Sequence, residues 1–492
     1  MRVLNSEQIL SHGNINGRKD IMEILEAGLR ATDPYNNTMS LFERDGNILK
    51  VGNPRFEADG DPNSGIDTLD LNDYNRVFVV GAGKGVQRIA KAIEDVLGDW
   101  LTCGEVISKH GDESILKRIG NTYGAHPTPD EGCVAGSKKI FELSKDITER
   151  DLVFTIITNG GSSLLTLPCD GISLKDVEDI TYLVQIVKGI PTSDLNNIRN
   201  NIDRLKAGRI TRAFHPAKMY HLFGADANCA NGKKWSCKYE GMTNYERTLR
   251  SNRWLHNLPD ASTFEDAKRI IEMYDLKSEC PKSILDAIYE ADPANEVLKY
   301  EEYIMTNSRF FGIMPDDEGV KASRDKAVEL GYDTYVLTRM LCTEAKAAAQ
   351  MTTAIALNID LSKEPFVPPV ALITAGELLV TVGKSTGIGG RNQEFCLSAA
   401  MSIKDRRKII IGSVDSDGTD GPGGLNLDGA PDCLGGAIVD GHTAIEAEEM
   451  GLCLFDYLKE HASSEPLWKL GSGLNIEHGI STNDITVTLI QK

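Results

Sequence analysis

A nine-residue stretch near the C-terminus combines glycine, amide and charged side chains in a pattern that suits anion binding. In "GIGGRNQEF" (387–395), Gly389, Gly390 and Arg391 directly precede an apolar helical pattern. Backbone N–H groups at the start of a helix attract anions, and a guanidinium forms bidentate hydrogen bonds with carboxylate or phosphate oxygens. The stretch therefore predicts an anion site. The alternative is that the glycines only form a turn and Arg391 lies on the surface.

Two further glycine turns carry a lysine or hydroxyl groups, and each is expected to follow a buried strand. They contain Gly83 and Lys84 in "VVGAGKGVQ" (79–87), and Gly160, Gly161, Ser162 and Ser163 in "TNGGSSLL" (158–165). Because open α/β sheets bind ligands at the carboxyl ends of their strands, both turns predict phosphate or carboxylate binding. The alternatives are a surface lysine and serines that cap a helix. The first turn matches neither the dinucleotide G-x-G-x-x-G pattern nor a Walker A motif, which disfavours a nicotinamide cofactor.

A third kind of chemistry is suggested by an acidic, glycine-rich loop. "SVDSDGTDGPGG" (413–424) brings Asp415, Asp417 and Asp420 together after an apolar run. Carboxylate oxygens are the ligands that Mg²⁺ prefers, and a carboxylate can also act as a general base toward a hydroxyl group. The loop is no calcium-binding EF-hand, because Asn426 stands where that loop has its bidentate Glu. The alternative is a set of Asx-turns that only shapes the loop.

The elements that would position these side chains alternate along the chain. Short apolar runs, which predict strands buried on both faces, begin near residues 76, 152, 219, 370, 408 and 485. Helical patterns lie at 20–31, 86–97, 174–187 and 342–358. This alternation predicts an α/β fold of two domains, each a mostly parallel sheet with helices on both faces (Rossmann-like).

A proline-rich segment predicts the domain boundary. Pro365, Pro368 and Pro369 end a helical pattern and precede a new set of strands. We therefore expect a large N-terminal domain at 17–365 and a C-terminal domain at 366–492, with the residues before 17 as a loose lead-in.

Composition excludes several classes of protein. The 492 residues are 41% hydrophobic and 25% charged, with a formal net charge of −19, which argues against a nucleic-acid partner. Since there is no apolar run of membrane-spanning length and no signal-peptide pattern, we expect a cytoplasmic protein with no membrane partner. The ten cysteines show no C-x-x-C pair and are expected to be reduced thiols.

The motifs, taken in order, resemble the type II glycerate kinase family, whose C-terminal half is called the MOFRL domain. The resemblance covers most of the chain and rests on "GAGKG", "HPTPD", "TNGGSSLL", "NNIRNNIDRLKAGR", "PDASTFEDA", "AGELLVTV", "GGRNQEF", "DGTDGPGG" and "STNDITV". It implies a two-domain α/β enzyme that transfers the γ-phosphoryl group of ATP, with Mg²⁺, to the 2-hydroxyl of D-glycerate, giving 2-phosphoglycerate. The active site of the family lies between the domains.

The resemblance, joined to the motif chemistry, gives a set of expected site residues. The expected catalytic residues are Lys84, Arg391 and Asp417. The expected substrate- or nucleotide-binding residues are Gly83, Gly160, Gly161, Ser162, Ser163, Arg199, Gly389, Gly390, Glu377 and Asp420. The expected metal ligands are Asp415, Asp417 and Asp420.

Two segments depart from the family pattern and leave the acceptor open. Asn200 and Asn201 follow Arg199 where the family has a lysine-histidine pair. Between 223 and 267 only Asp226 and the "PDASTFEDA" end are recognisable, and 228–256 is basic and aromatic. This insertion predicts a lid that reshapes acceptor specificity, with a surface loop or subunit contact as the alternative.

Three functions fit the sequence. The first is an ATP-dependent glycerate 2-kinase, the second a kinase of the same fold that acts on another hydroxy or sugar acid, and the third a non-catalytic binding protein. The expected partners are ATP and a small hydroxy acid, and the sequence also allows a homo-oligomer.

Overall fold

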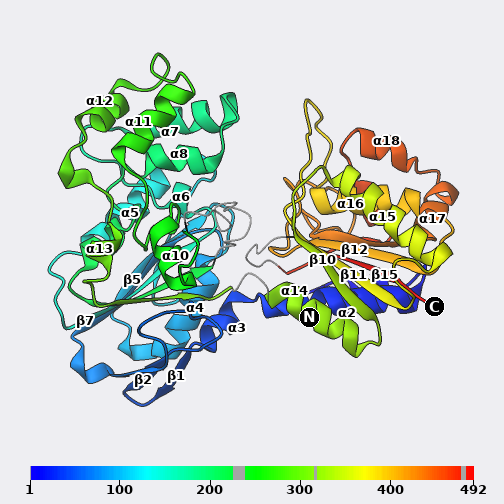
Figure 1. Cartoon of the computed structure of the whole chain (residues 1–492), viewed down its shortest axis with the longest axis horizontal. Coiled ribbons are helices and arrows are strands. Elements are labelled where there is room, and N and C mark those ends of the chain that lie inside the picture. Colours follow the sequence, from blue (N-terminus) through cyan, green and yellow to red (C-terminus); the bar gives the residue numbers. More distant parts are fainter. Residues whose placement is uncertain (1, 225–238, 315–317, 478–483) are drawn as a thin grey trace. The chain divides into compact units, whose positions relative to one another are not determined.

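The chain folds into two compact units, shown with their elements in Figure 1. The structure is a computed structural model that describes residues 2–224, 239–314, 318–477 and 484–492. We call the part at 34–224 and 239–314 the parallel-sheet unit, and the part at 2–33, 318–477 and 484–492 the mixed-sheet unit. These units do not follow the boundary expected at residue 365, because the segments at 2–33 and 318–365 belong with the C-terminal strands.

The parallel-sheet unit is built on six strands in the order β6-β5-β4-β7-β8-β9, all parallel. The predicted apolar strands at 76, 152 and 219 form its centre, and β7 is buried along its whole length. The six strands are β4 (Arg76–Ala82), β5 (Cys103–Lys109), β6 (Gly120–Gly124), β7 (Asp151–Thr158), β8 (Lys218–Gly224) and β9 (Ser308–Gly312). A small antiparallel sheet contains β1 (Phe42–Asp45), β2 (Ile48–Val51) and β3 (Asp67–Asp70).

Helices cover this sheet, and four of them gather into a subdomain with its own core. Valine, leucine and isoleucine side chains of α7, α8, α11 and α12 pack together there, and Figure 1 shows these helices side by side. The helices of the unit are α3 (Pro34–Met39), α4 (Val86–Leu97), α5 (Glu131–Leu143), α6 (Gly161–Leu164), α7 (Leu174–Thr181), α8 (Thr192–Arg199), α9 (Arg209–Phe214), α10 (Asn244–Ser251), α11 (Phe264–Met273), α12 (Lys282–Glu290) and α13 (Tyr300–Tyr303).

The mixed-sheet unit contains a second six-stranded sheet, in the order β10-β11-β15-β12-β13-β14. Within it, β10 and β11 pair in parallel, whereas the other four pairings are antiparallel. The prediction of a mostly parallel sheet is therefore wrong here, although the α/β class is confirmed. Helices bury both faces of this sheet, so its antiparallel strands are as apolar as parallel strands would be. The direction of these strands therefore cannot be predicted from their composition.

The helices of this unit lie on two sides of the sheet (Figure 1). Side chains of α2 and α14 join one core and those of α15 and α16 the other. The strands are β10 (Asp333–Leu341), β11 (Val370–Gly376), β12 (Ile409–Asp415), β13 (Gly436–Asp440), β14 (Gly473–Leu474) and β15 (Asp484–Ile490). The helices are α1 (Ser6–Ile9), α2 (Ile15–Ala31), α14 (Glu318–Glu329), α15 (Ala345–Ser362), α16 (Arg391–Ser402), α17 (Thr443–Glu449), α18 (Leu454–Lys459) and α19 (Ser464–Lys469).

The N-terminal residues are not the loose lead-in that the sequence suggested. Val3 forms a β-bridge with Ile476, and Arg2 donates a hydrogen bond of 3.0 Å to the carbonyl oxygen of Ser416. Ile9 is buried in the core of the mixed-sheet unit. The apolar residues of this segment are too few to predict a helix from the sequence. In the structure, Val3 and Ile9 nevertheless complete the core.

Candidate active site

Two of the three predicted glycine turns lie side by side in the parallel-sheet unit. They follow β4 and β7, which are neighbours in the sheet. The chain fills the sheet from β4 in one direction and then returns to β7 on the other side, so these turns flank the topological switch point, where α/β sheets bind ligands. The Lys84 N–H donates to the Asn159 carbonyl oxygen at 2.8 Å, which ties one turn to the other.

Glycine is required at both turns for different reasons. Gly83 has φ +142°, and a Cβ there would lie 1.9 Å from Thr158 Oγ1, so the two turns pack backbone against side chain. Gly160 has φ +84°, and a Cβ there would lie 3.1 Å from both Lys84 Cγ and His126 Cδ2. Gly160 therefore leaves its backbone uncovered between a lysine and a histidine. Gly161 packs toward Ile157 of the sheet.

Arg199 adds a second cation to this site. It ends α8 and is 3% exposed, and its Nε and Nη2 both donate to Asn196 Oδ1, at 3.3 and 2.8 Å. In the described residues no carboxylate forms an ion pair with it, because Asp203 instead pairs with Lys206 Nζ at 2.5 Å. Burial lowers the pKa of Arg199 to about 10. A buried guanidinium with so little compensation favours the arrival of an anion.

His126 shares this positive environment. Burial, together with the positive charges of Lys84, Lys109 and Arg199, lowers the pKa of His126 to about 4. The imidazole is therefore neutral at pH 7 and available as a hydrogen-bond partner or proton acceptor. His126 was not among the expected site residues, although the "HPTPD" motif contains it.

The two serines of the second turn differ in their surroundings. Ser163 is 3% exposed and donates to the Ala125 carbonyl oxygen at 3.1 Å, so its hydroxyl connects this turn to the segment after β6. Ser162 is half-buried, and its Oγ lies 2.8 Å from Nε2 of His256. Asn196 Nδ2 donates to the same oxygen at 3.4 Å. Sequence reasoning missed both His256 and Asn196, since neither stands in a motif that predicts contact with this turn.

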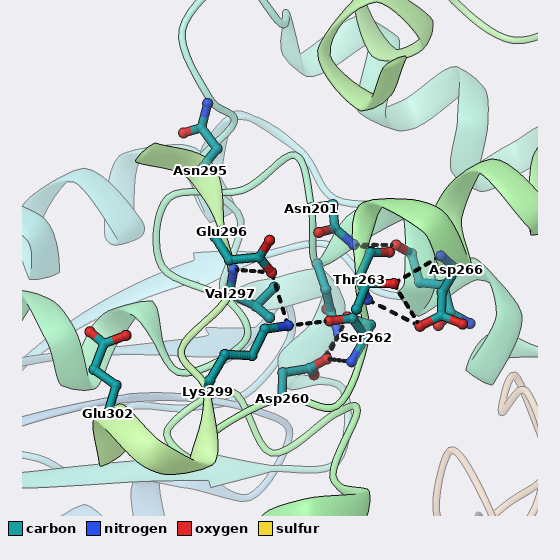
Figure 2. Close-up of polar contacts among 12 residues, drawn as sticks. Asn201, Asp260, Ser262, Thr263, Asp266, Asn295, Glu296, Val297, Lys299 and Glu302 are labelled. Carbon is teal, nitrogen blue, oxygen red and sulfur yellow. Dashed lines mark hydrogen bonds and ion pairs between the residues drawn. The ribbon is translucent and has the colours of Figure 1, made fainter. Parts of the chain in front are cut away.

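The asparagines that replace the family's lysine-histidine pair connect the end of α8 to the segment at 260–263. Figure 2 shows Asn201 donating to the Thr263 carbonyl oxygen (3.4 Å) and Asp260 accepting from the Ser262 N–H (2.7 Å). Asn200 donates to Asp260 Oδ2 at 2.9 Å. Burial raises the pKa of Asp260. These contacts fix the segment that follows His256 against the helix that carries Arg199.

The basic insertion at 228–256 is only partly a lid or loop candidate. Residues 225–238 lie outside the described residues, but Tyr245 and Leu249 of α10 are buried in a core that also contains Phe310. The Tyr245 and Phe310 rings stack with centroids 5.2 Å apart. Arg253 donates to Asn197 Oδ1. The described part, 239–256, is therefore an integral part of the unit, because its aromatic and aliphatic side chains are buried in the core of that unit.

In the mixed-sheet unit, Arg391 is the centre of an acidic cluster. Its Nε donates to Asp484 Oδ1 and Oδ2 at 3.0 and 2.9 Å, and its Nη2 donates to Asp415 Oδ2 at 2.8 Å. Glu377 Oε1 lies 3.4 Å from Nη1. Asp484 starts β15 opposite Asp415, so the sheet register itself brings the two carboxylates together. The anions that the described structure places on Arg391 are thus the protein's own carboxylates.

The N-terminus of α16 is likewise filled by an internal carboxylate. Asp420 accepts from the N–H groups of Asn392 and Gln393 at 3.1 and 2.9 Å. A Cβ on Gly390 would lie 1.9 Å from the Asp420 carbonyl oxygen, and one on Gly389 would lie 2.5 Å from Ser463 Oγ. The glycines thus let this loop pack against α16, and Asp420 occupies the helix N-terminus at which we expected an external anion.

The three aspartates predicted as metal ligands do not converge. In the described ranges, no group of three or more His, Cys, Asp or Glu side chains is arranged to hold a metal ion. Asp420 turns to α16, while Asp417 Oδ1 accepts from the Thr419 N–H at 2.7 Å. Asp415 accepts from the Asp417 N–H at 3.0 Å. Burial and the neighbouring carboxylate of Asp417 raise the pKa of Asp415, and burial raises that of Asp484 to about 6.

Comparison with known proteins decides the family. The sequence matches the model "Domain of unknown function (DUF4147)" over residues 20–228 and the model "MOFRL family" over residues 370–486. A glycerate 2-kinase from Pyrococcus horikoshii is 32% identical over 477 residues, which is 95% of this chain and 98% of that protein. The chain belongs to the glycerate 2-kinase family. It is therefore a phosphotransferase that acts on an alcohol group, and not a non-catalytic binding protein.

Other members of the glycerate 2-kinase family agree in sequence and in structure. A D-glycerate 2-kinase from Thermotoga maritima is 31% identical over 432 residues, 86% of this chain and 93% of that protein. The crystal structure of glycerate kinase from Thermotoga maritima matches with a TM-score of 0.74 at 28% identity, covering 96% of this chain and 99% of that one. Among the described helices, none has the length and apolar character needed to cross a membrane.

Proposed function

We propose that this chain transfers the γ-phosphoryl group of ATP to the 2-hydroxyl of D-glycerate, giving 2-phosphoglycerate, in the cytoplasm. The observation that carries the proposal is the cationic site at the switch point of the parallel sheet. There Lys84 and His126 flank the backbone of Gly160, and the positive charge of the uncompensated Arg199 also acts on His126. Both ATP and glycerate are anions, and phosphoryl transfer requires positioning and charge stabilisation more than covalent chemistry from the protein.

Lys84 and Arg199 differ in what they offer an anion. Lys84 is exposed and carries a compact charge that can follow a phosphoryl group during transfer. Arg199 is fixed by Asn196 and presents a rigid guanidinium, which suits the planar carboxylate of a hydroxy acid. His126 is neutral and near Lys84, so we assign it to accept a hydrogen bond from the acceptor hydroxyl, although its low pKa makes it a weak proton acceptor.

The acidic cluster of the mixed-sheet unit fits Mg²⁺ with fewer ligands than expected. Mg²⁺ that accompanies a nucleotide needs only one or two carboxylates, because phosphates and water complete its shell. Asp417 is half-buried, with Oδ1 engaged by Thr419, and it is the residue we assign to hold the ion, assisted by Asp415. When bound, Mg²⁺ would neutralise charge on the phosphates. Arg391 holds Asp415 and Asp484 in place and opposes the rise in their pKa values that burial causes.

A second acceptor class deserves a test because of the residues around Arg199. Asn200 and Asn201 stand in place of the family's lysine-histidine pair, and His256 contacts the serine turn. A larger hydroxy or sugar acid is therefore the alternative acceptor that the assay must include.

The test is a coupled assay of ADP formation with D-glycerate, tartronate, erythronate, threonate and longer aldonates, with ³¹P NMR to identify the product. We expect D-glycerate to give the highest kcat/KM and 2-phosphoglycerate to be the product. A higher kcat/KM for a four-carbon or longer acid would select the alternative, and no ADP formation with any acid would reject both.

A further inference from the structure

The His256–Ser162 pair is joined across 94 residues and has a defined direction of hydrogen bonding. His256 is fully buried, and its Nδ1 accepts a hydrogen bond of 3.4 Å from the Ala207 N–H. A ring nitrogen that accepts carries no hydrogen, so in the neutral imidazole the proton resides on Nε2. Nε2–H therefore donates to Ser162 Oγ across 2.8 Å.

Imidazolium is disfavoured at this position. The ring is enclosed by protein, and the positive charges of Lys206, Arg199 and Arg209 surround it, so its pKa lies well below the ordinary value. The direction of the hydrogen bond to Ser162 thus holds throughout the neutral pH range.

Asn196 supplies a second donor to the same hydroxyl. Its Oδ1 accepts both hydrogen bonds from Arg199, which fixes the orientation of the amide. Its Nδ2 consequently faces Ser162 Oγ, at 3.4 Å. A serine hydroxyl has two acceptor positions and one hydrogen, and both acceptor positions are now filled. The described residues contain no acceptor for the remaining hydrogen of Ser162.

We propose that His256 is a positioning residue that turns the Ser162 hydroxyl into an obligate donor toward an anionic oxygen of the substrate, beside Arg199. The inference rests on the proposed function and narrows it: Ser162 recognises a carboxylate or a phosphate oxygen, and rejects a ligand group that only donates. The two sources of such an oxygen are the hydroxy acid and the nucleotide, and separate titrations distinguish them.

His256 lies in the segment between 223 and 267, where the sequence departs from the family pattern. The "TNGGSSLL" motif alone says that a hydroxyl is present. Only the fold shows that His256 and Asn196 dictate which way its hydrogen points.

The test uses isothermal titration calorimetry of the full chain with D-glycerate and, separately, with ADP, so that it does not depend on turnover. Ser162→Ala should weaken binding of one of the two probes about ten- to hundredfold, as expected for a hydrogen bond to a charged group. His256→Leu should weaken the same probe about three- to tenfold, because the hydroxyl regains its three staggered positions. His256→Gln, which retains an N–H donor near Nε2, should restore affinity to within about twofold.

The double variant separates positioning from general damage to the fold. If His256 acts through Ser162, adding His256→Leu to Ser162→Ala should weaken binding by no more than about twofold further. His221→Leu is the matched control, because His221 is also fully buried and bonded to a hydroxyl, that of Thr155, at 2.7 Å. It should leave both affinities unchanged while lowering the melting temperature comparably.

Three outcomes would overturn the inference. Additive losses in the double variant, or an affinity of His256→Leu equal to wild type for both probes, would show that His256 does not orient Ser162. If wild type binds neither probe, the inference and the proposed function fall together. If wild type binds normally and phosphorylates D-glycerate but the variants are unaffected, the inference alone is wrong.

Discussion

The guanidinium of Arg391 contacts both carboxylate oxygens of Asp484 through a single nitrogen, at 3.0 and 2.9 Å. A second nitrogen of Arg391 donates to Asp415 at 2.8 Å, and Asp415 lies directly opposite Asp484 in the pairing of β12 with β15. Both carboxylates are buried, so this one cation compensates two negative charges that have little access to water. Arg391, which we expected to bind a substrate anion, thus reduces the repulsion between two buried carboxylates of the protein itself.

Replacing Arg391 should therefore lower the stability of the protein as well as its activity. Arg391→Ala leaves Asp415 and Asp484 without their partner, which should cost about 3–5 kcal/mol of stability. Arg391→Lys should recover less than half of this, since a point charge cannot serve two carboxylates in a fixed fork. Melting curves and urea midpoints of the three proteins, measured at pH 7.5, provide the check. A lysine variant as stable and active as wild type would contradict this account.

The aspartates of the acidic loop should separate into two classes. Asp420→Asn places an N–H₂ group against the N–H groups of Asn392 and Gln393, so it should cost about 1–2 kcal/mol by spoiling a helix cap. Asp417→Asn removes a half-buried charge and should change stability by less than about 0.5 kcal/mol. The Mg²⁺ concentration for half-maximal rate should rise sharply for Asp417→Asn only. Equal metal dependence in both variants would show that Asp417 does not hold the ion.

Much of this fold and part of the site are encoded in local patterns. The apolar runs at 76, 152 and 219 predict strands that form β4, β7 and β8, and the α4 pattern predicts a helix at its observed bounds. The glycine turns after β4 and β7 are likewise visible in sequence, because they stand at the ends of buried runs.

Strand direction and long-range contacts could not be predicted. β12 and β15 are buried on both faces whether their neighbours run parallel or antiparallel, so composition gave the wrong direction. Asp484 opens β15 and reaches Arg391 only through the register of that sheet. His256 meets Ser162 across 94 residues. Such pairs depend on how the strands and helices assemble, which single-sequence periodicity does not describe.

Lys84 should matter for catalysis and little for folding. The side chain is exposed, and no described carboxylate pairs with it, so Lys84→Ala should lower kcat/KM by about a hundredfold or more through lost charge stabilisation. Lys91→Ala is the control on α4, the helix that follows this turn, because Lys91 pairs with Asp95 away from the turn. Rates from the coupled assay and melting temperatures should diverge for Lys84→Ala alone. Activity within about threefold of wild type would place Lys84 outside the site.

His126 predicts a pH dependence with a definite sign. Its pKa is about 4 in the folded chain against the ordinary value of 6.5, so the unfolded chain binds more protons between these values. The stability associated with the neutral ring is present above pH 6.5 and is lost as pH falls toward 4. His126→Gln should reduce this acid loss by up to about 3 kcal/mol. The melting temperatures of both proteins between pH 4 and 7.5 test this, and parallel curves would refute it.

Binding should move the same pKa in the other direction. An anion beside Lys84 and Arg199 neutralises the charges that disfavour imidazolium, so ligand binding near pH 5.5 should take up protons. Calorimetric titration with D-glycerate and with ADP in buffers of different ionisation enthalpy measures this uptake. In His126→Gln the uptake should disappear. An uptake that persists in the variant would assign the proton to another group.

The last prediction tests whether the bare backbone at Gly160 is part of the binding surface. Gly160→Ala meets two obstacles: the left-handed φ of +84°, and a Cβ 3.1 Å from Lys84 Cγ and His126 Cδ2. Gly171 has nearly the same backbone, with φ +85°, but a Cβ there meets nothing within 4 Å. Both alanine variants should therefore lose about 1 kcal/mol of stability from the backbone. Only Gly160→Ala should also push Lys84 and His126 apart and lower kcat/KM by at least about tenfold, since small displacements at a reacting centre are costly. Equal melting temperatures with unequal rates would separate crowding of the site from backbone strain. Equal rates in the two variants would mean that the ligand does not approach Gly160, and the site would have to lie elsewhere on this edge of the sheet.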